Sequence, residues 1–219
     1  MSRGRVKLLA LLVVAVSSAT IVAQRGQAVP AGATPVLHPP RLVVMIVVDQ
    51  MRADYISLYG HQWTKGLRRL VDTSAMFPLA AYPYTLTVTC PGHATVSTGS
   101  FPSTHGMAGN EWYDRELRRS VSCTENTEFT DVPFGGRTAT DHHGLARLKV
   151  PTFADELRLQ SPRRPTIVSI SLKPRSALNL AGRPSPSTYP IWEENNGTWA
   201  TSSAYTSKPW PVVDQYVTA

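Results

Sequence analysis

The chain has 219 residues, enough for one domain or for part of a larger one. Hydrophobic residues make up 42% and charged residues 17%, which is ordinary for a globular protein and excludes wholesale disorder. The formal net charge is +7, but the basic residues form no dense run and no stripe with interleaved aromatics, so a nucleic acid is not expected as a specific partner.

Residues 1–28 have the layout of a secretory signal peptide. Basic residues precede an apolar run at 8–16, and small residues then lead to Ala23 and Ala28. The apolar run is short for a membrane span, so we favour cleavage over a stable membrane anchor. The expected location is periplasmic or secreted.

The folded part is expected to begin at Arg41, after a flexible, proline-rich lead-in at 29–40. The unbroken apolar run Leu42–Val48 is typical of a parallel strand buried on both faces. Residues 63–73 carry apolar side chains at helical spacing and predict a covering helix. A short strand is predicted at 75–80 and a helix from near Gly92.

Farther along, a helix is predicted at 152–160 and a strand at 166–172. This order of strands and helices predicts an α/β fold with a largely parallel sheet flanked by helices. Residues 183–219 show no clear helix or strand. A full doubly wound domain needs further units, so we expect a truncated core that exposes apolar sheet edges.

Two cysteines, Cys90 and Cys123, are present. In an exported protein they could form a disulfide. Two free thiols fit equally well, because Cys90 lies in a segment with candidate active-site residues. The sequence leaves both alternatives open.

Two segments carry residues suited to chemistry. Asp49 follows the run at 42–48, and functional groups gather where the strands of open α/β sheets end. It fits a metal ligand and a turn or cap residue equally well. Residues 85–100 place several hydroxyls just before a predicted helix, whose N-terminus favours an anion. Simple capping is the alternative.

Four segments occur in an order typical of one family: Val-Val-Asp-Gln-Met-Arg (47–52), Thr-Val-Thr-Cys-Pro-Gly-His (87–93), Thr-Gly-Ser-Phe-Pro-Ser-Thr-His-Gly-Met-Ala-Gly-Asn (98–110) and Ser-Leu-Lys-Pro-Arg (171–175). Together they resemble the nucleotide pyrophosphatase/phosphodiesterase branch of the alkaline-phosphatase superfamily, and within it the bacterial PafA-like alkaline phosphatases. The resemblance covers most of 41–219, which it identifies as the N-terminal portion of an alkaline-phosphatase-like catalytic domain.

The resemblance implies roles for four of these residues. Thr89 would be the nucleophile that forms a phosphothreonine intermediate. Asp49 and Thr89 would both bind one of two zinc ions, and zinc lowers the pKa of a coordinated hydroxyl. Asn110 would donate its side-chain amide to a phosphoryl oxygen, assisted by the backbone N–H of Cys90.

Lys173 and Arg175 bear on the substrate class. In the family this Lys-x-Arg pair contacts phosphoryl oxygens and marks monoesterases, because a monoester dianion exposes an additional charged oxygen that cations stabilise. The resemblance therefore implies a small phosphate monoester as substrate. A phosphodiesterase or nucleotide pyrophosphatase on the same scaffold is the alternative, and solvated surface charges are the non-functional one.

The metal ligand set is incomplete in this sequence. Only Asp49 and Thr89 match family ligands, and no Asp or His pair after Arg175 fits the remaining ones. A catalytic zinc normally takes three protein ligands. We therefore expect a phosphomonoesterase by family but an inactive fragment when the chain stands alone.

Three further features are interpreted as structural. Asp141-His142-His143 resembles a metal cluster, but it lies in a loop rich in Gly and Thr. His93 and His105 are expected to hydrogen-bond around the active-site segment. A sulfatase is rejected, because Cys90 begins Cys-Pro-Gly-His-Ala, whereas that class requires Cys-x-Pro-x-Arg.

Overall fold

The structure is a computed structural model that describes residues 40–194 and 196–219. The predicted signal peptide at 1–28 and all but the last residue of the lead-in at 29–40 lie outside the described residues. The chain divides after Ile46 into two units, Met1–Ile46 and Val47–Ala219. None of the helices in the described part has the length and apolar character needed to cross a membrane.

The strand predicted at Leu42–Val48 is not formed. These residues have no hydrogen-bonded strand partner, and Leu42 and Ile46 are 78% and 71% exposed. An apolar run becomes a buried parallel strand only when neighbouring strands pair with it and helices cover it. Its composition was typical of such a strand, but the described chain supplies no such neighbours.

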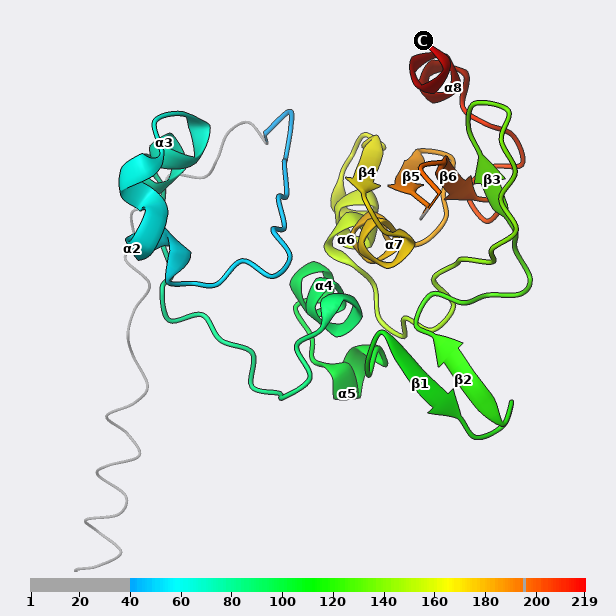
Figure 1. Cartoon of the computed structure of the whole chain (residues 1–219), viewed down its shortest axis with the longest axis horizontal. Coiled ribbons are helices and arrows are strands. Elements are labelled where there is room, and N and C mark those ends of the chain that lie inside the picture. Colours follow the sequence, from blue (N-terminus) through cyan, green and yellow to red (C-terminus); the bar gives the residue numbers. More distant parts are fainter. Residues whose placement is uncertain (1–39, 195) are drawn as a thin grey trace, which may run out of the picture. The chain divides into compact units, whose positions relative to one another are not determined.

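The second unit begins with short helices, labelled in Figure 1: α2 (Tyr55–Tyr59), η1 (Gly60–Gln62) and α3 (Gly66–Thr73). The helix predicted at 63–73 is confirmed as α3, with a later start. Arg68 and Asp72, one turn apart, form an ion pair on its surface. The strand predicted at 75–80 is wrong, because no strand pairs with it and Leu79 is 93% exposed.

Two helices and a hairpin follow: α4 (Thr89–Thr98), α5 (Pro102–His105), β1 (Glu111–Asp114) and β2 (Arg119–Ser122). Helix α4 starts earlier than the predicted position near Gly92, since a proline fits within the first turn of a helix. It ends at Gly99, whose φ of 65° gives the left-handed conformation common after a helix. Strands β1 and β2 pair antiparallel, with Glu111 opposite Ser122.

The main sheet has the order β3-β6-β5-β4. Its strands are β3 (Asp131–Pro133), β4 (Ile167–Ser171), β5 (Thr188–Glu193) and β6 (Trp199–Ser202). Only β4 and β5 pair in parallel, joined by a helical crossover. A short connection makes β5 and β6 antiparallel. The α/β class is confirmed, but the described sheet is mixed rather than largely parallel.

The remaining helices are α6 (Phe153–Gln160), α7 (Pro174–Ala181) and α8 (Pro211–Thr218). Thr152 and Asp155 form a capping box at the start of α6, which confirms the helix predicted at 152–160. Strand β4 confirms the strand predicted at 166–172. The expectation of no regular structure at 183–219 is wrong, because β5, β6 and α8 all form there.

The core lies where α4 and α7 pack against each other and α7 packs on β4 and β5 (Figure 1). It includes Cys90, Leu178 and Trp192, all fully buried. Each large apolar side chain buried in this way contributes about 1.5–3 kcal/mol. The outer edge strand β4 leaves Val168 and Ile170 more than half exposed, so the apolar sheet edge expected from the sequence is present.

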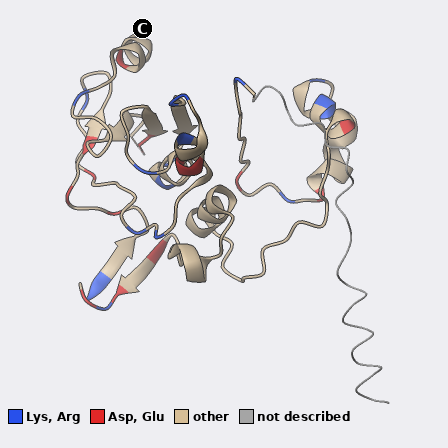
Figure 2. Cartoon of the chain, turned by 180° about the vertical axis from the view of Figure 1, so that it is seen from behind, with Lys and Arg blue, Asp and Glu red and all other residues tan. Residues whose placement is uncertain are grey.

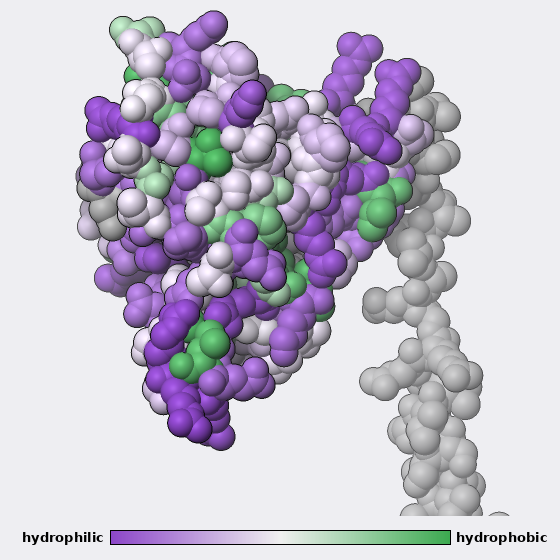
Figure 3. All heavy atoms as spheres, turned by 90° about the vertical axis from the view of Figure 1, so that its right-hand side faces the viewer, coloured by the Kyte–Doolittle hydropathy of each residue, from purple (hydrophilic) through white to green (hydrophobic). Residues whose placement is uncertain are grey.

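Charge is spread over the described surface. Figure 2 shows basic and acidic segments scattered along the ribbon, without a long basic stretch. The β1–β2 hairpin, at the bottom of Figure 3, is mostly hydrophilic.

Candidate active site

The candidate nucleophile lies in the first turn of α4. Thr89 is the first residue of this helix and is only 9% exposed. The first N–H groups of a helix have no acceptor within the helix, and together with the helix dipole they favour negative charge. Thr89 therefore lies at an end of α4 that suits an anionic group.

The structure brings Asp49 to Thr89 from 40 residues away in the sequence. Thr89 Oγ1 donates a hydrogen bond to Asp49 Oδ2 at 3.1 Å. The other carboxylate oxygen, Oδ1, accepts the backbone N–H of Gln50 at 3.2 Å. The two residues expected to bind zinc are thus neighbours, although the strand predicted to carry Asp49 is not formed.

Asn110 approaches the same turn of α4. The backbone N–H of Cys90 donates to Asn110 Oδ1 at 2.8 Å. Because a backbone N–H can only donate, this bond fixes which end of the carboxamide is the oxygen. The amide nitrogen Nδ2 is left as the free donor. In this structure the Cys90 N–H is bonded to Asn110, and its expected assistance to a phosphoryl oxygen stays a prediction.

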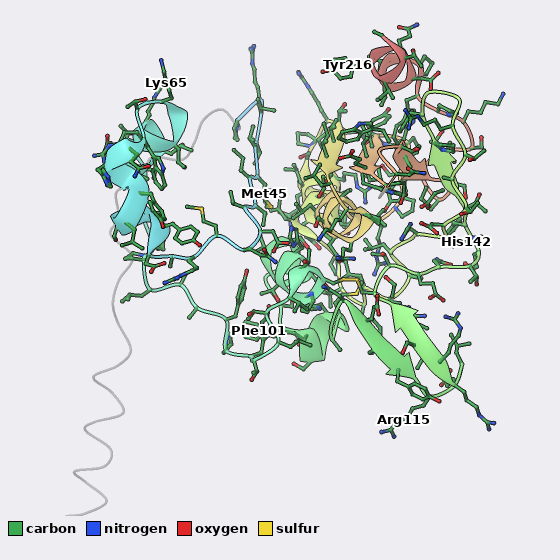
Figure 4. All side chains as sticks on the ribbon, viewed as in Figure 1. Met45, Lys65, Phe101, Arg115, His142 and Tyr216 are labelled. Atoms are coloured by element: carbon green, nitrogen blue, oxygen red, sulfur yellow. A yellow bond between two sulfur atoms is a disulfide. The ribbon has the colours of Figure 1, made fainter. Side chains whose placement is uncertain are left out.

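Cys90 and Cys123 form a disulfide, and both are fully buried. This bond decides between the alternatives left open by the sequence. It joins the residue after Thr89 to the residue that follows β2. The base of the hairpin is therefore covalently attached to the first turn of α4, and Figure 4 draws this bridge in yellow beside that helix.

The two candidate phosphate-binding cations lie at the start of α7. Lys173 precedes the helix and is exposed, whereas Arg175 lies in its first turn and is half-buried. Arg175 Nε is buried without a hydrogen-bond partner among the described residues. Helix α7 packs against α4, which carries Thr89. An unpaired buried donor of this kind is costly unless an acceptor binds it.

Both motif histidines hydrogen-bond as expected. His93 Nδ1 lies 2.8 Å from the carbonyl oxygen of Thr89. His105 accepts the Met107 N–H at Nδ1, so its Nε2 carries the proton that reaches Thr95 Oγ1 at 3.1 Å. Burial lowers the pKa of His105, which favours the neutral ring.

A second cluster of titratable groups joins His143 to Asp131 and Glu194. The His143 ring and its backbone N–H both donate to Asp131, at 2.5 and 3.1 Å. Trp192 Nε1 donates to Glu194 at 2.5 Å. His143 is therefore part of a hydrogen-bonded cluster, whereas its neighbours His142 and Asp141 are exposed. Asp131 and Glu194 lie outside the four motif segments, so the sequence did not predict that they belong to this cluster.

An open hollow of about 510 Å³ lies beside Asp49. Besides Asp49, Gln50 and Gln62, its walls include Met51, Tyr55, Tyr59 and Trp63. The last four side chains are aromatic or apolar apart from the tyrosine hydroxyls. No sequence pattern predicted this hollow, because it depends on how α2 and α3 fold after Asp49.

The fit of these residues to a zinc ion is partial. Asp49 and Thr89 provide a carboxylate and a hydroxyl side by side, and both are suitable oxygen donors. Within the described ranges, only Asp131, His143 and Glu194 form a group of three potential ligands. In that group, Asp131 already accepts a hydrogen bond from the His143 ring, and Glu194 accepts one from Trp192. Asp49 and Thr89 therefore offer two ligands where a catalytic zinc takes three.

The fold and the site agree with one class of protein, the type I phosphodiesterases and nucleotide pyrophosphatases. Residues 43–208 match the family model of type I phosphodiesterases and nucleotide pyrophosphatases, and the chain belongs to this family. This confirms the resemblance found in the sequence motifs. Relatives in this family are named as phosphatases and phosphodiesterases.

Individual relatives place the chain near bacterial alkaline phosphatases. It is 36% identical to alkaline phosphatase PafA of Elizabethkingia meningoseptica over 90% of this chain and 35% of PafA. It is 32% identical to alkaline phosphatase PhoV of Synechococcus elongatus, over 92% of this chain and 36% of PhoV. The chain thus spans about a third of the length of these relatives.

The crystal structure of PafA matches 78% of this chain and 32% of its own, with a TM-score of 0.71 and 34% identity. A second PafA structure, with substitutions at a threonine, an asparagine, a lysine and an arginine, also gives a TM-score of 0.71. The similarity extends to the three-dimensional arrangement of the described α/β core.

Proposed function

We propose that this chain is the N-terminal portion of a zinc-dependent phosphomonoesterase in which Thr89 is the nucleophile. The observation that carries the proposal is the hydrogen bond from Thr89 Oγ1 to Asp49 Oδ2 at the start of α4. A hydroxyl beside a carboxylate, at a helix end that favours anions, suits attack on a phosphate ester. Zinc bound by this pair lowers the pKa of the hydroxyl.

The proposed hydrolysis of the phosphate ester takes place in two steps. Thr89 Oγ1 forms a bond to phosphorus and releases its proton to solvent, while the bond from phosphorus to the alcohol oxygen breaks and the alcohol takes up a proton. Water then attacks phosphorus and the bond to Oγ1 breaks. Inorganic phosphate leaves, and Thr89 regains its hydroxyl proton.

The other residues bind and orient the phosphoryl group. The Asn110 Nδ2 group remains available as a donor, because Oδ1 accepts the Cys90 N–H. The Nε of Arg175 is buried and has no hydrogen-bond partner among the described residues. Lys173 lies two residues before it in the sequence. These cations suit the additional charge of a monoester dianion. The aromatic hollow beside Asp49 suits the organic part of a small ester.

The relatives support these assignments. PafA and PhoV are named alkaline phosphatases. The substituted PafA structure carries its changes at a threonine, an asparagine, a lysine and an arginine, in that order along its chain. Thr89, Asn110, Lys173 and Arg175 are the same residue types in the same order. A phosphodiesterase is the second candidate, favoured by the family description.

The test uses the protein as its gene encodes it, including any sequence after Ala219. We expect Thr89→Ala to abolish turnover of 4-nitrophenyl phosphate, and mass spectrometry after acid quench to find phosphate on Thr89 in the unmodified protein. The exposed Thr87 gives a matched control, Thr87→Ala, which keeps activity. Near-normal turnover by the Thr89 variant would refute the nucleophile assignment.

Among residues 40–194 and 196–219, only Asp49 and Thr89 are proposed as ligands of this zinc site. We therefore expect no turnover and no tight zinc uptake from residues 1–219 by themselves. The location follows from the proposed signal peptide at 1–28, and export to the periplasm or medium is expected. Expression with the native leader, followed by N-terminal analysis of the exported protein, tests cleavage near Ala23 or Ala28.

A further inference from the structure

The Cys90–Cys123 bridge lies beside three parts of the proposed phosphoryl-binding site: the start of α4, Asn110 and helix α7. Cys90 follows Thr89 in α4, and its N–H holds the side chain of Asn110 at 2.8 Å. The N–H of Cys123 holds the backbone carbonyl of the same asparagine at 2.9 Å. Asn110 is thus held at two points by the two residues that the disulfide joins.

The bridge also reaches the helix that carries Arg175. Asn179 on α7 is fully buried, and its Nδ2 donates to Cys90 Sγ at 3.3 Å and to the Arg175 carbonyl oxygen at 2.7 Å. One side chain therefore links the sulfur of Cys90 to the first turn of α7. Both partner helices of the site contact the same cystine.

We propose that the Cys90–Cys123 disulfide is a positioning element that holds the Asn110 carboxamide with its Nδ2 group free to donate to the phosphoryl group. This inference rests on the proposed function. Asn110 immediately precedes β1 and Cys123 immediately follows β2, so the two lie at the open end of the hairpin.

A physical argument explains why the hydrogen bonds alone are not enough. A two-stranded hairpin of four-residue strands is marginally stable by itself. Without the covalent bridge, its open end is held to α4 by the Cys90–Asn110 hydrogen bond and by packing of Trp112 against the core, and neither contact is covalent. The carboxamide then samples several orientations, and a donor that is not preorganised loses most of its effect on the transition state.

The first experiment is a double-mutant cycle on kcat/KM for 4-nitrophenyl phosphate in the protein as its gene encodes it. With the bridge intact, we expect Asn110→Ala to lower kcat/KM by about 100-fold or more, as for other preorganised donors. In the Cys90→Ala/Cys123→Ala background, the same change is expected to cost less than about tenfold, because Asn110 is no longer held.

Gly182→Ala is the matched control for lost stability, since it acts at the other end of α7 and leaves the bridge and Asn110 unchanged. In that background Asn110→Ala is expected to show its full effect. Equal losses from Asn110→Ala with and without the bridge would overturn the proposal. If the unmodified protein hydrolyses no phosphate ester, the proposed function fails and the cycle is replaced by the second experiment.

The second experiment needs no activity. Hydrogen exchange is measured at the backbone N–H groups of positions 90 and 123, in the oxidised chain, in the chain reduced with a phosphine, and in the double alanine variant. We expect both groups to exchange at least about tenfold faster without the bridge, whereas the Gly99 N–H, bonded to Thr95 within the α4 C-cap, keeps its rate. Unchanged protection at position 90 would overturn the proposal, and so would complete unfolding on reduction, because the bridge would then serve folding alone.

Discussion

Thr89 Oγ1 lies 3.1 Å from Asp49 Oδ2, although 40 residues of sequence separate the two side chains. The contact forms between a turn and the first residue of α4, and neither depends on the strand that was predicted to carry Asp49. The proposed nucleophile and its neighbouring carboxylate are therefore brought together by the path of the chain from Asp49 to the start of α4.

This contact makes Asp49→Asn an informative change. The substitution keeps the size of the side chain but removes the charge that a zinc ion requires from a carboxylate ligand. In the protein as its gene encodes it, we expect zinc content and kcat/KM both to fall by about 100-fold or more. Asp54→Asn, at an exposed aspartate paired with Arg52, is the control and keeps both. Full zinc content in the Asp49 variant would contradict the assignment.

The Lys173 and Arg175 side chains are expected to decide between monoester and diester substrates. Lys173→Ala/Arg175→Ala removes the two cations, and we expect monoester hydrolysis to fall at least about 100-fold more than diester hydrolysis. The neighbouring exposed pair Arg163 and Arg164 provides a control of equal charge change. Equal losses on 4-nitrophenyl phosphate and bis-4-nitrophenyl phosphate would favour the phosphodiesterase alternative.

Gly182 supports the junction of α6 and α7. Its φ of 77° and ψ of −163° lie in a region that is essentially restricted to glycine. A Cβ there would overlap Thr152 Oγ1 and lie 2.7 Å from Asp155 Oδ1. We expect Gly182→Ala to lower the free energy of unfolding by about 3 kcal/mol or more in urea denaturation.

Gly99→Ala is the control for that measurement. Gly99 also has a positive φ, of 65°, but a Cβ there meets nothing within 4 Å. Backbone strain alone is expected to cost about 1–2 kcal/mol. Equal effects at the two positions would show that the contact with the α6 capping box contributes nothing.

His143 and Glu194 are expected to make the stability of the fold depend on pH. Burial alone would lower the pKa of His143, but its hydrogen bond to Asp131 and the nearby charges of Asp131, Glu194 and Asp141 raise the pKa overall. Burial and the charge of Asp131 raise the pKa of Glu194 as well. Both groups bind protons more tightly in the folded chain, so their stabilisation is lost as the pH rises through the folded pKa.

The measurement is the free energy of unfolding in urea from about pH 6.5 upward, where at least half of an unfolded histidine is deprotonated. We expect a decline with pH that becomes shallower in His143→Gln. His142→Gln, at the exposed neighbouring histidine, leaves the slope unchanged. A rise in stability over this range that depends on His143 would contradict the assignment. His105 acts in the opposite sense, since its pKa is lowered by burial and its contribution is lost as the pH falls.

Local sequence patterns were enough for part of the fold. The capping box at Thr152 and Asp155 and the helical spacing at 66–73 act within one turn of a helix, so α6 and α3 follow from their own residues. The four motifs were likewise sufficient to identify the family, because each is a contiguous segment. Candidate residues such as Thr89 and Asn110 came from these segments.

The tertiary structure decided what depends on distant neighbours. The run at 42–48 has the composition of a buried strand, yet it is unpaired, because a buried parallel strand needs flanking strands and covering helices that the run itself does not supply. The pairing of Cys90 with Cys123, the orientation of Asn110 and the joining of Asp131 to Glu194 each need contact between separate elements. Such contacts depend on loop paths and packing, which local propensity does not encode.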